Sequence, residues 1–162
     1  MSKTLIVYGT RFGATEKSSE VIASVLREKF NHEVDVIKLS SQSGDIDYTD
    51  YDNVIIGSSL AMFSWTKRPK KFLKNDFGEK KIFVFISSAA LTYQAKLDGN
   101  MEKYEKWKNR FLDNVVKKRM KVKPVSTMVL GGWIKNNKGG YDLNNWNEED
   151  AINWAEEIGQ NT

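Results

Sequence analysis

The sequence predicts an α/β fold in which five parallel strands form a doubly wound sheet, with the strand order 2-1-3-4-5. Five short apolar runs, at residues 5–8, 34–37, 54–56, 82–86 and 127–130, are continuous rather than alternating, as in strands buried on both faces. Helical patterns separate most of these runs, and strands that alternate with helices form crossover units in a parallel sheet. The length of 162 residues suits one domain, spanning residues 1–162.

Helical periodicity predicts three amphipathic helices and a short fourth one. Apolar residues recur at three- and four-residue spacing over residues 16–30, 104–116 and 148–158, so each of these stretches has one apolar face. Residues 70–74 show a weaker helical pattern. Residues 40–51 are polar and their structure is poorly defined by the sequence, and residues 136–145 are expected to be a surface loop.

The composition excludes several kinds of chemistry. Without cysteine there is no disulfide, thiolate metal site or cysteine nucleophile, and the single histidine, His32, excludes a multi-histidine metal site. The net charge is +4, and Lys and Arg cluster at residues 67–74 and 117–123. Such clusters can attract acidic protein partners, anionic lipid or nucleic acid, although a solvated surface is the plainer interpretation of each. The chain begins without a charged and apolar leader, so we expect a soluble cytoplasmic protein.

The turn between the first strand and the first helix has the composition of a phosphate-binding loop. A helix N-terminus offers unpaired N–H groups and partial positive charge, glycine lets the backbone curl around an anion, and threonine adds hydroxyl donors. An ordinary turn capped by threonine is the alternative. The turn lacks the Gly-Lys-Ser/Thr of a triphosphate loop and the third glycine of a dinucleotide loop, which favours a phosphomonoester. The predicted residues are Thr10, Arg11, Phe12, Gly13, Ala14 and Thr15.

This turn resembles the phosphate loop of flavodoxins, whose usual form is Ser/Thr-x-Thr-Gly-x-Thr, with Phe12 where threonine is usual. The resemblance extends through the five strands and implies a flavodoxin-like fold with FMN at the carboxyl ends of the strands. The chain looks most similar to the subgroup that contains the bacterial flavodoxin-type protoporphyrinogen dehydrogenase. Three features suggest this: the Thr-Arg-x-Gly-x-Thr turn, Ile-Gly-Ser-Ser-Leu at residues 56–60, and a long fourth crossover.

The resemblance implies two further FMN-binding segments, after the third and fourth strands. The first would lie along the isoalloxazine ring, with Phe63 and Trp65 as stacking candidates; each could instead cap the core. The second would approach the other side of the ring through small residues, with Tyr93 as a weaker stacking candidate. The predicted residues are Ser58, Ser59, Leu60, Ala61, Met62, Phe63 and Trp65 in the first segment, and Ser87, Ser88, Ala89, Ala90 and Tyr93 in the second.

Bound FMN is compatible with two classes of function. An electron carrier needs no catalytic side chain and no metal, and the sequence offers neither. The basic charge fits a carrier less well, because electron-carrying flavodoxins are typically acidic, so the partner of this chain would need to be acidic. The alternative is an FMN-dependent dehydrogenase of the protoporphyrinogen or quinone-linked type, because basic charge could also favour anionic membrane or a propionate-bearing substrate. Against it, residues 131–146 are short and polar where the resemblance implies a long, basic and apolar insert.

We favour the carrier, and a flavin-free interaction module that kept the fold is a third possibility. The expected partners are redox proteins, with no nucleic acid and at most peripheral membrane contact, and the protein could be a monomer or a dimer. The helix at residues 104–116, with its basic extension to residue 123, is the expected protein-docking surface; its alternative is an amphipathic helix with a solvated outer face.

Overall fold

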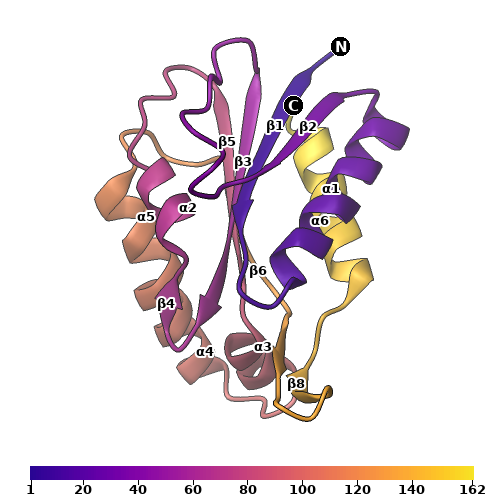
Figure 1. Ribbon diagram of the computed structural model, residues 1–162, viewed down its shortest axis with the longest axis vertical. Helices are drawn as coiled ribbons and strands as arrows, with labels where there is room; N and C mark the ends of the chain where they lie inside the picture. The colour runs from indigo at the N-terminus through magenta and orange to yellow at the C-terminus, as the bar shows by residue number, and fades with distance from the viewer.

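A parallel sheet with the strand order β2-β1-β3-β5-β6 forms the centre of the computed structural model, which describes residues 1–162 (Figure 1). This is the predicted order, with β5 and β6 as the fourth and fifth strands, so the predicted fold class is confirmed. All four pairings are parallel, and every carboxyl end therefore lies at the same edge of the sheet. The strands are β1 (Lys3–Gly9), β2 (Glu33–Lys38), β3 (Asn53–Ala61), β5 (Lys81–Ser87) and β6 (Ser126–Leu130).

Helices cover both faces of the sheet (Figure 1). On one face, α1 (Ala14–Phe30) packs beside α6 (Glu148–Gln160). On the other lie α2 (Lys67–Phe72) and a longer helical run made of α4 (Met101–Lys108), the π-helical turn η1 (Asn109–Asp113) and α5 (Asn114–Arg119). Successive strand residues alternate between the two cores: Leu5 and Val7 face α2 and α5, whereas Ile6 faces α1 and α6.

The predicted helices are present with shifted bounds. The helix predicted at residues 104–116 corresponds to the α4–η1–α5 run. The short helix predicted at residues 70–74 corresponds to α2, which begins three residues earlier, at Lys67. Residues 40–51 contain no helix or strand, but Ile46, Tyr48 and Tyr51 pack against the core. None of the helices combines the length and the apolar character that crossing a membrane requires.

Three segments that follow strands have regular structure of their own. Residues after β5 form the helix α3 (Ala89–Lys96), because the Ser88 hydroxyl caps it by accepting the N–H of Leu91 at 3.1 Å. The segment after β6 forms a hairpin of β7 (Trp133–Lys135) and β8 (Tyr141–Asn144), so the loop predicted at residues 136–145 is partly wrong. The third strand runs on to Ala61 and folds back as β4 (Ser64–Trp65).

His32 connects the amino-terminal strand to the last residue of the chain. The Thr162 hydroxyl donates to the carbonyl of Gly159, so its oxygen accepts the Nε2–H of His32 at 3.0 Å. Nδ1 then accepts the hydroxyl of Thr4 at 2.9 Å, and the Thr4 oxygen accepts a side-chain N–H of Asn53 at 3.1 Å. This assignment of protons satisfies the neutral imidazole, which is only 8% exposed.

Burial lowers the pKa of His32 below its ordinary value, although the Asp52 carboxylate opposes the shift. As the pH is lowered, His32 in the unfolded chain is therefore protonated at about pH 6.5, whereas His32 in the folded chain is protonated only at a lower pH. We expect the free energy of unfolding to fall as the pH is lowered through that value. Urea unfolding of the wild type and of His32→Gln between about pH 7.5 and pH 5.5 measures this. Equal pH dependence in the two proteins would contradict the assignment.

Candidate functional site at the carboxyl edge of the sheet

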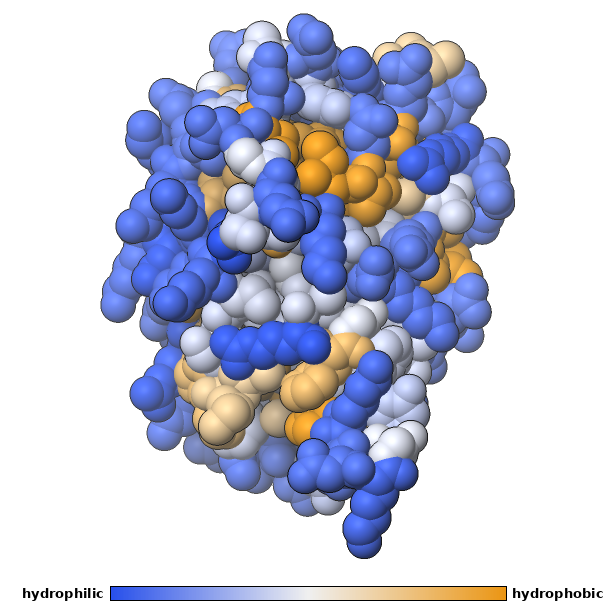
Figure 2. Space-filling model, viewed as in Figure 1, coloured by the Kyte–Doolittle hydropathy of each residue, from blue (hydrophilic) through white to orange (hydrophobic).

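A cavity of about 490 Å³ lies at the carboxyl edge of the sheet, where three of the predicted segments meet. Its size is in the range of small-molecule and cofactor sites, about 300–1,000 Å³. In Figure 2 the lower end of the visible face has apolar surface between hydrophilic side chains, near the end of the molecule that holds this cavity. The lining residues are Arg11, Phe12, Ala14, Ser59, Leu60, Ala61, Met62, Phe63, Ser87, Ser88, Ala89, Ala90, Gly132, Trp133 and Ile134.

The β1–α1 turn has the geometry of an anion cradle. Gly13 caps α1 with φ +99°, a conformation that favours glycine, and its N–H donates to the Thr10 hydroxyl oxygen at 2.9 Å. The N–H groups of Ala14, Thr15 and Glu16, in the first turn of α1, donate to no acceptor within the chain. Unpaired donors at a helix N-terminus carry partial positive charge, so the loop is suited to an anion.

Three hydroxyl groups gather at this cradle. Ser59, on β3, accepts the N–H of Arg11 at 3.2 Å, and its oxygen lies 3.0 Å from the Thr15 hydroxyl and 3.4 Å from that of Thr10. Thr15 and Ser59 are both buried. Ser59 was predicted to lie along the ring of a flavin, but the structure places its hydroxyl with the threonines of the turn, because β1 and β3 pair in register up to Gly9 and Ser58.

Arg11 connects the β1–α1 turn to the β3–β4 hairpin. Its guanidinium donates to the carbonyl of Ala61 at 3.0 Å and to that of Trp65 at 3.5 Å. The side chain thus crosses one side of the cavity and holds two walls together. Arg11 is also the only ionisable residue among those that line the cavity.

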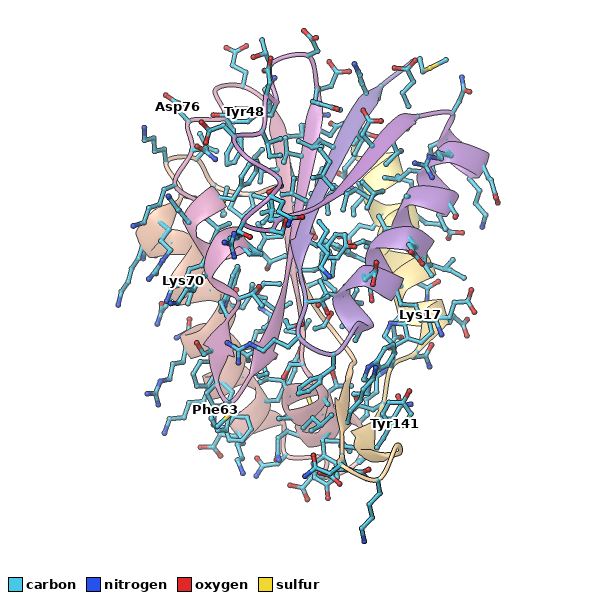
Figure 3. The ribbon with its side chains drawn as sticks, in the orientation of Figure 1. Lys17, Tyr48, Phe63, Lys70, Asp76 and Tyr141 are labelled. Carbon is cyan, nitrogen blue, oxygen red and sulfur yellow. The ribbon has the colours of Figure 1, made fainter.

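The β7–β8 hairpin forms a wall that the sequence analysis missed. Trp133, Ile134 and Gly132 line the cavity, and the Trp133 indole N–H donates to the Phe12 carbonyl at 2.6 Å. Tyr141, on β8, supports Trp133 with an edge-on ring contact at 6.0 Å. Figure 3 shows Tyr141 on the opposite side of this end of the molecule from Phe63. A tryptophan next to a Gly-Gly pair is the only signal in the sequence that could have indicated this wall.

The side of the cavity formed by β5 and α3 contains an unpaired polar atom. The Ser87 hydroxyl is buried and has no hydrogen-bond partner, although it belongs to a residue that lines the cavity. The N–H groups of Ala89 and Ala90, at the start of α3, also donate to no acceptor in the chain. Buried polar groups without partners are uncommon, so these atoms indicate where a polar ligand would be held.

Six predicted residues do not line the cavity: Thr10, Gly13 and Thr15 belong to the cradle beside it, and Ser58, Trp65 and Tyr93 lie elsewhere. Ser58 points to the opposite face of β3 from Ser59, and its hydroxyl bonds to Thr66 at the start of α2. Trp65, 4% exposed, packs in the core, and its indole N–H donates to the carbonyl of Phe111 at 2.6 Å. Its position fits the alternative of a core cap rather than a stacking residue. Tyr93, 39% exposed, lies on α3 away from the cavity, because its segment is helical.

The turn between β3 and β4 is strained. Ala61 pairs with Ser64, so Met62 and Phe63 form a two-residue turn, and both have positive φ, at 51° and 59°. A type I′ turn requires this conformation and favours Asn-Gly, because larger residues have a steric cost of about 1–2 kcal/mol each. Phe63 packs against Phe111 and Trp107, whereas Met62 is 92% exposed.

A family model described as a flavodoxin domain matches residues 5–140, which is most of the chain. A search of curated protein sequences found no match.

Several solved structures are similar to the whole chain, including two flavodoxins and a quinone oxidoreductase. One is oxidised flavodoxin 1 from Bacillus cereus, with 18% identity, 99% of each chain covered and a TM-score of 0.65. Another is a short-chain flavodoxin associated with a non-canonical PDU bacterial microcompartment, with 15% identity, 99% of each chain covered and a TM-score of 0.59. The third is an NAD(P)H:quinone oxidoreductase from Methanothermobacter marburgensis, with 13% identity, 99% of this chain and 98% of that chain covered, and a TM-score of 0.58. At these identities the similarity shows the fold.

Replacing Met62 should relieve the strain in the β3–β4 turn. Asparagine tolerates positive φ and the Met62 side chain is almost fully exposed, so Met62→Asn should raise the free energy of unfolding by about 1 kcal/mol. Met62→Ala removes the same side chain but keeps the strain, so it is the matched control. Urea unfolding measures both variants, and equal stability of Asn and Ala at this position would contradict the turn geometry.

Proposed function

The chain belongs to the flavodoxin family, and we propose that it binds FMN in the cavity at the carboxyl edge of the sheet and transfers electrons between redox partner proteins. The observation that carries the proposal is the pairing of an anion cradle with an adjoining apolar cavity. In this assignment, residues 1–162 form one FMN-binding domain.

The phosphate of FMN would be held by the β1–α1 turn. The unpaired N–H groups of Ala14, Thr15 and Glu16 can donate to its oxygens, and the hydroxyls of Thr10, Thr15 and Ser59 can turn their protons toward it. Charge-assisted hydrogen bonds of this kind are stronger than neutral ones. No lysine is needed at such a site, because the helix N-terminus supplies the positive charge.

The isoalloxazine ring would lie in the apolar part of the cavity. Phe12, Phe63 and Trp133 supply aromatic surface around it, which suits a flat heterocycle. The unpaired Ser87 hydroxyl and the N–H groups of Ala89 and Ala90 supply donors that could hold the polar edge of the ring. Bound FMN supplies the redox chemistry by accepting and releasing one or two electrons, and the protein positions it and limits its contact with water.

The lining of the cavity supports a carrier over a dehydrogenase. No carboxylate, imidazole or amine lines it, so no side chain there is placed to take a proton from an organic substrate. A protoporphyrinogen or quinone-linked dehydrogenase is the second candidate, favoured by the Thr-Arg-x-Gly-x-Thr turn and the basic charge. However, the segment at residues 131–146, where the dehydrogenase insert was expected, contains the short β7–β8 hairpin.

FMN added to the flavin-free protein should bind and change its visible absorption spectrum. Riboflavin, which has the same ring but no phosphate, should bind at least about 100-fold more weakly, because it loses several charge-assisted hydrogen bonds. Titration followed by absorption and flavin fluorescence measures both ligands. Absence of FMN binding would reject the proposed function and favour the flavin-free module. Rapid oxidation of protoporphyrinogen or of a quinol by the loaded protein would favour the dehydrogenase.

The double variant Thr10→Ala/Thr15→Ala should weaken FMN binding by about 1–3 kcal/mol, because it removes two of the three hydroxyl groups at the cradle. Riboflavin binding should change little. Thr49→Ala, in the exposed segment between β2 and β3, is the control, and circular dichroism checks that each variant folds. If the double variant binds FMN with unchanged affinity, the phosphate is held elsewhere.

A further inference from the structure

The segments that contain the helices α2 and α4–η1–α5, which lie on one face of the sheet, carry most of the basic residues. Residues 67–74 and 101–123, which contain α2 and the α4–η1–α5 run, hold 14 of the 25 Lys and Arg but only 3 of the 21 Asp and Glu. This basic layer therefore has a net charge of +11, and the remainder of the chain, with 11 basic and 18 acidic residues, has −7. The overall charge of +4 therefore combines strongly basic helices with an acidic remainder of the chain.

The cations of the basic layer are available to a partner. None of the 14 side chains is buried, and only Lys108 forms an ion pair, with Asp113 at 3.1 Å. Lys70, labelled in Figure 3, lies on the helix α2 on this side of the molecule. Unpaired cations on one face create a field that attracts acidic proteins over distances of about 10 Å at moderate salt.

An aromatic cluster joins the basic layer to the cavity. Phe63 stacks on Phe111 with ring centroids 5.3 Å apart and meets Trp107 edge-on at 5.3 Å. Lys103 lies 4.6 Å from the centre of the Trp107 ring, and Arg110 lies 5.2 Å from that of Phe111. We define the tip patch as these five residues and Met62. Since Met62 and Phe63 also line the cavity, the patch extends from the cavity to the basic layer.

The exposure of the apolar side chains of Met62 and Phe63, in a turn with positive φ, does not stabilise the fold. Met62 and Phe63 are 92% and 53% exposed, in a turn that Asn-Gly would form without strain. Strained backbone and exposed apolar side chains are both typical of contact sites. Their position beside the cavity suggests that this contact involves a protein that exchanges electrons with the bound ligand.

We propose that the tip patch and the basic layer form the docking surface for an acidic redox protein. The inference rests on the proposed function, because it needs FMN in the cavity. Apolar contact at Met62 and Phe63 would bring the partner close to the ring, and Lys67 and Lys106 would steer it. In each encounter one electron passes to an oxidised one-electron centre of the partner, a haem or an iron–sulfur cluster. Two encounters return FMNH₂ to FMN, with two protons released to water.

Cytochrome c and its fully succinylated form test whether the docking surface prefers an acidic partner, because the two proteins carry the same haem but have opposite net charges. The succinylated form should bind at least about tenfold more tightly at low salt, and this preference should fall as salt is raised toward about 0.2 M. Calorimetric titration of flavin-free and FMN-loaded protein measures binding apart from electron transfer. Equal binding of the two cytochromes, or a preference for the native form, would overturn the inference.

Two charge-reversal variants test the location. Lys67→Glu/Lys106→Glu changes two exposed lysines of the basic layer, and Lys135→Glu/Lys138→Glu makes the same change of charge on the β7–β8 hairpin, which forms another wall of the cavity. The first should weaken binding of the succinylated cytochrome by about tenfold, the second by no more than about twofold. Equal losses would mean that only net charge matters and would overturn the proposed surface.

Met62→Asn adds a test of the apolar contact. This variant should bind the succinylated cytochrome more weakly than the wild type although its fold is more stable, which is the trade-off expected of a residue kept for binding. Unchanged binding would remove Met62 from the docking surface. A protein that takes up FMN but does not distinguish the cytochromes rejects the docking inference alone, whereas a protein that binds no FMN rejects the proposed function.

Discussion

The parallel pairing of β1 with β3, and of β3 with β5, is the constraint on which the candidate site depends. In this register Gly9 lies opposite Ser58, and Ser59 lies opposite Ser87. The three strands therefore leave the sheet at one edge, and the segments that follow them meet there. A shift of one residue in β3 would turn Ser59 away from the β1–α1 turn and put Ser58 in its place. The hydroxyl cluster at the cradle is thus a direct product of strand register.

The cavity combines positive potential from separate parts of the fold. The N-termini of α1 and α3 both border it, and each presents unpaired N–H groups. The guanidinium of Arg11 adds a full charge, and no carboxylate lines the cavity to oppose it. The site therefore favours negative charge on whatever it holds.

The sheet order and the β1–α1 turn could be predicted because their signals are local. Continuous apolar runs indicate buried strands, and Gly13 stands between Thr10 and Thr15 in one short segment. The wall made by Trp133 could not be predicted, because it depends on a contact with Phe12 across 121 residues. The β3–β4 hairpin, which carries Trp65 into the core, was missed because Met-Phe is not a sequence that indicates a tight turn.

The π-helical turn η1 fixes the angle between the side of the helical run that contacts Phe63 and the side that packs in the core. It contains Phe111, whose ring stacks on Phe63 and whose carbonyl accepts the Trp65 indole N–H, and Leu112, which is buried in the core. Each residue of a helix advances the direction of its side chains by about 100°. Loss of one residue from this turn would therefore rotate Trp107 away from Phe63 while Val116 stayed packed in the core. The length of this run therefore affects the cavity rim, although none of its residues lines the cavity, and single-residue deletions there should disturb the rim more than substitutions do.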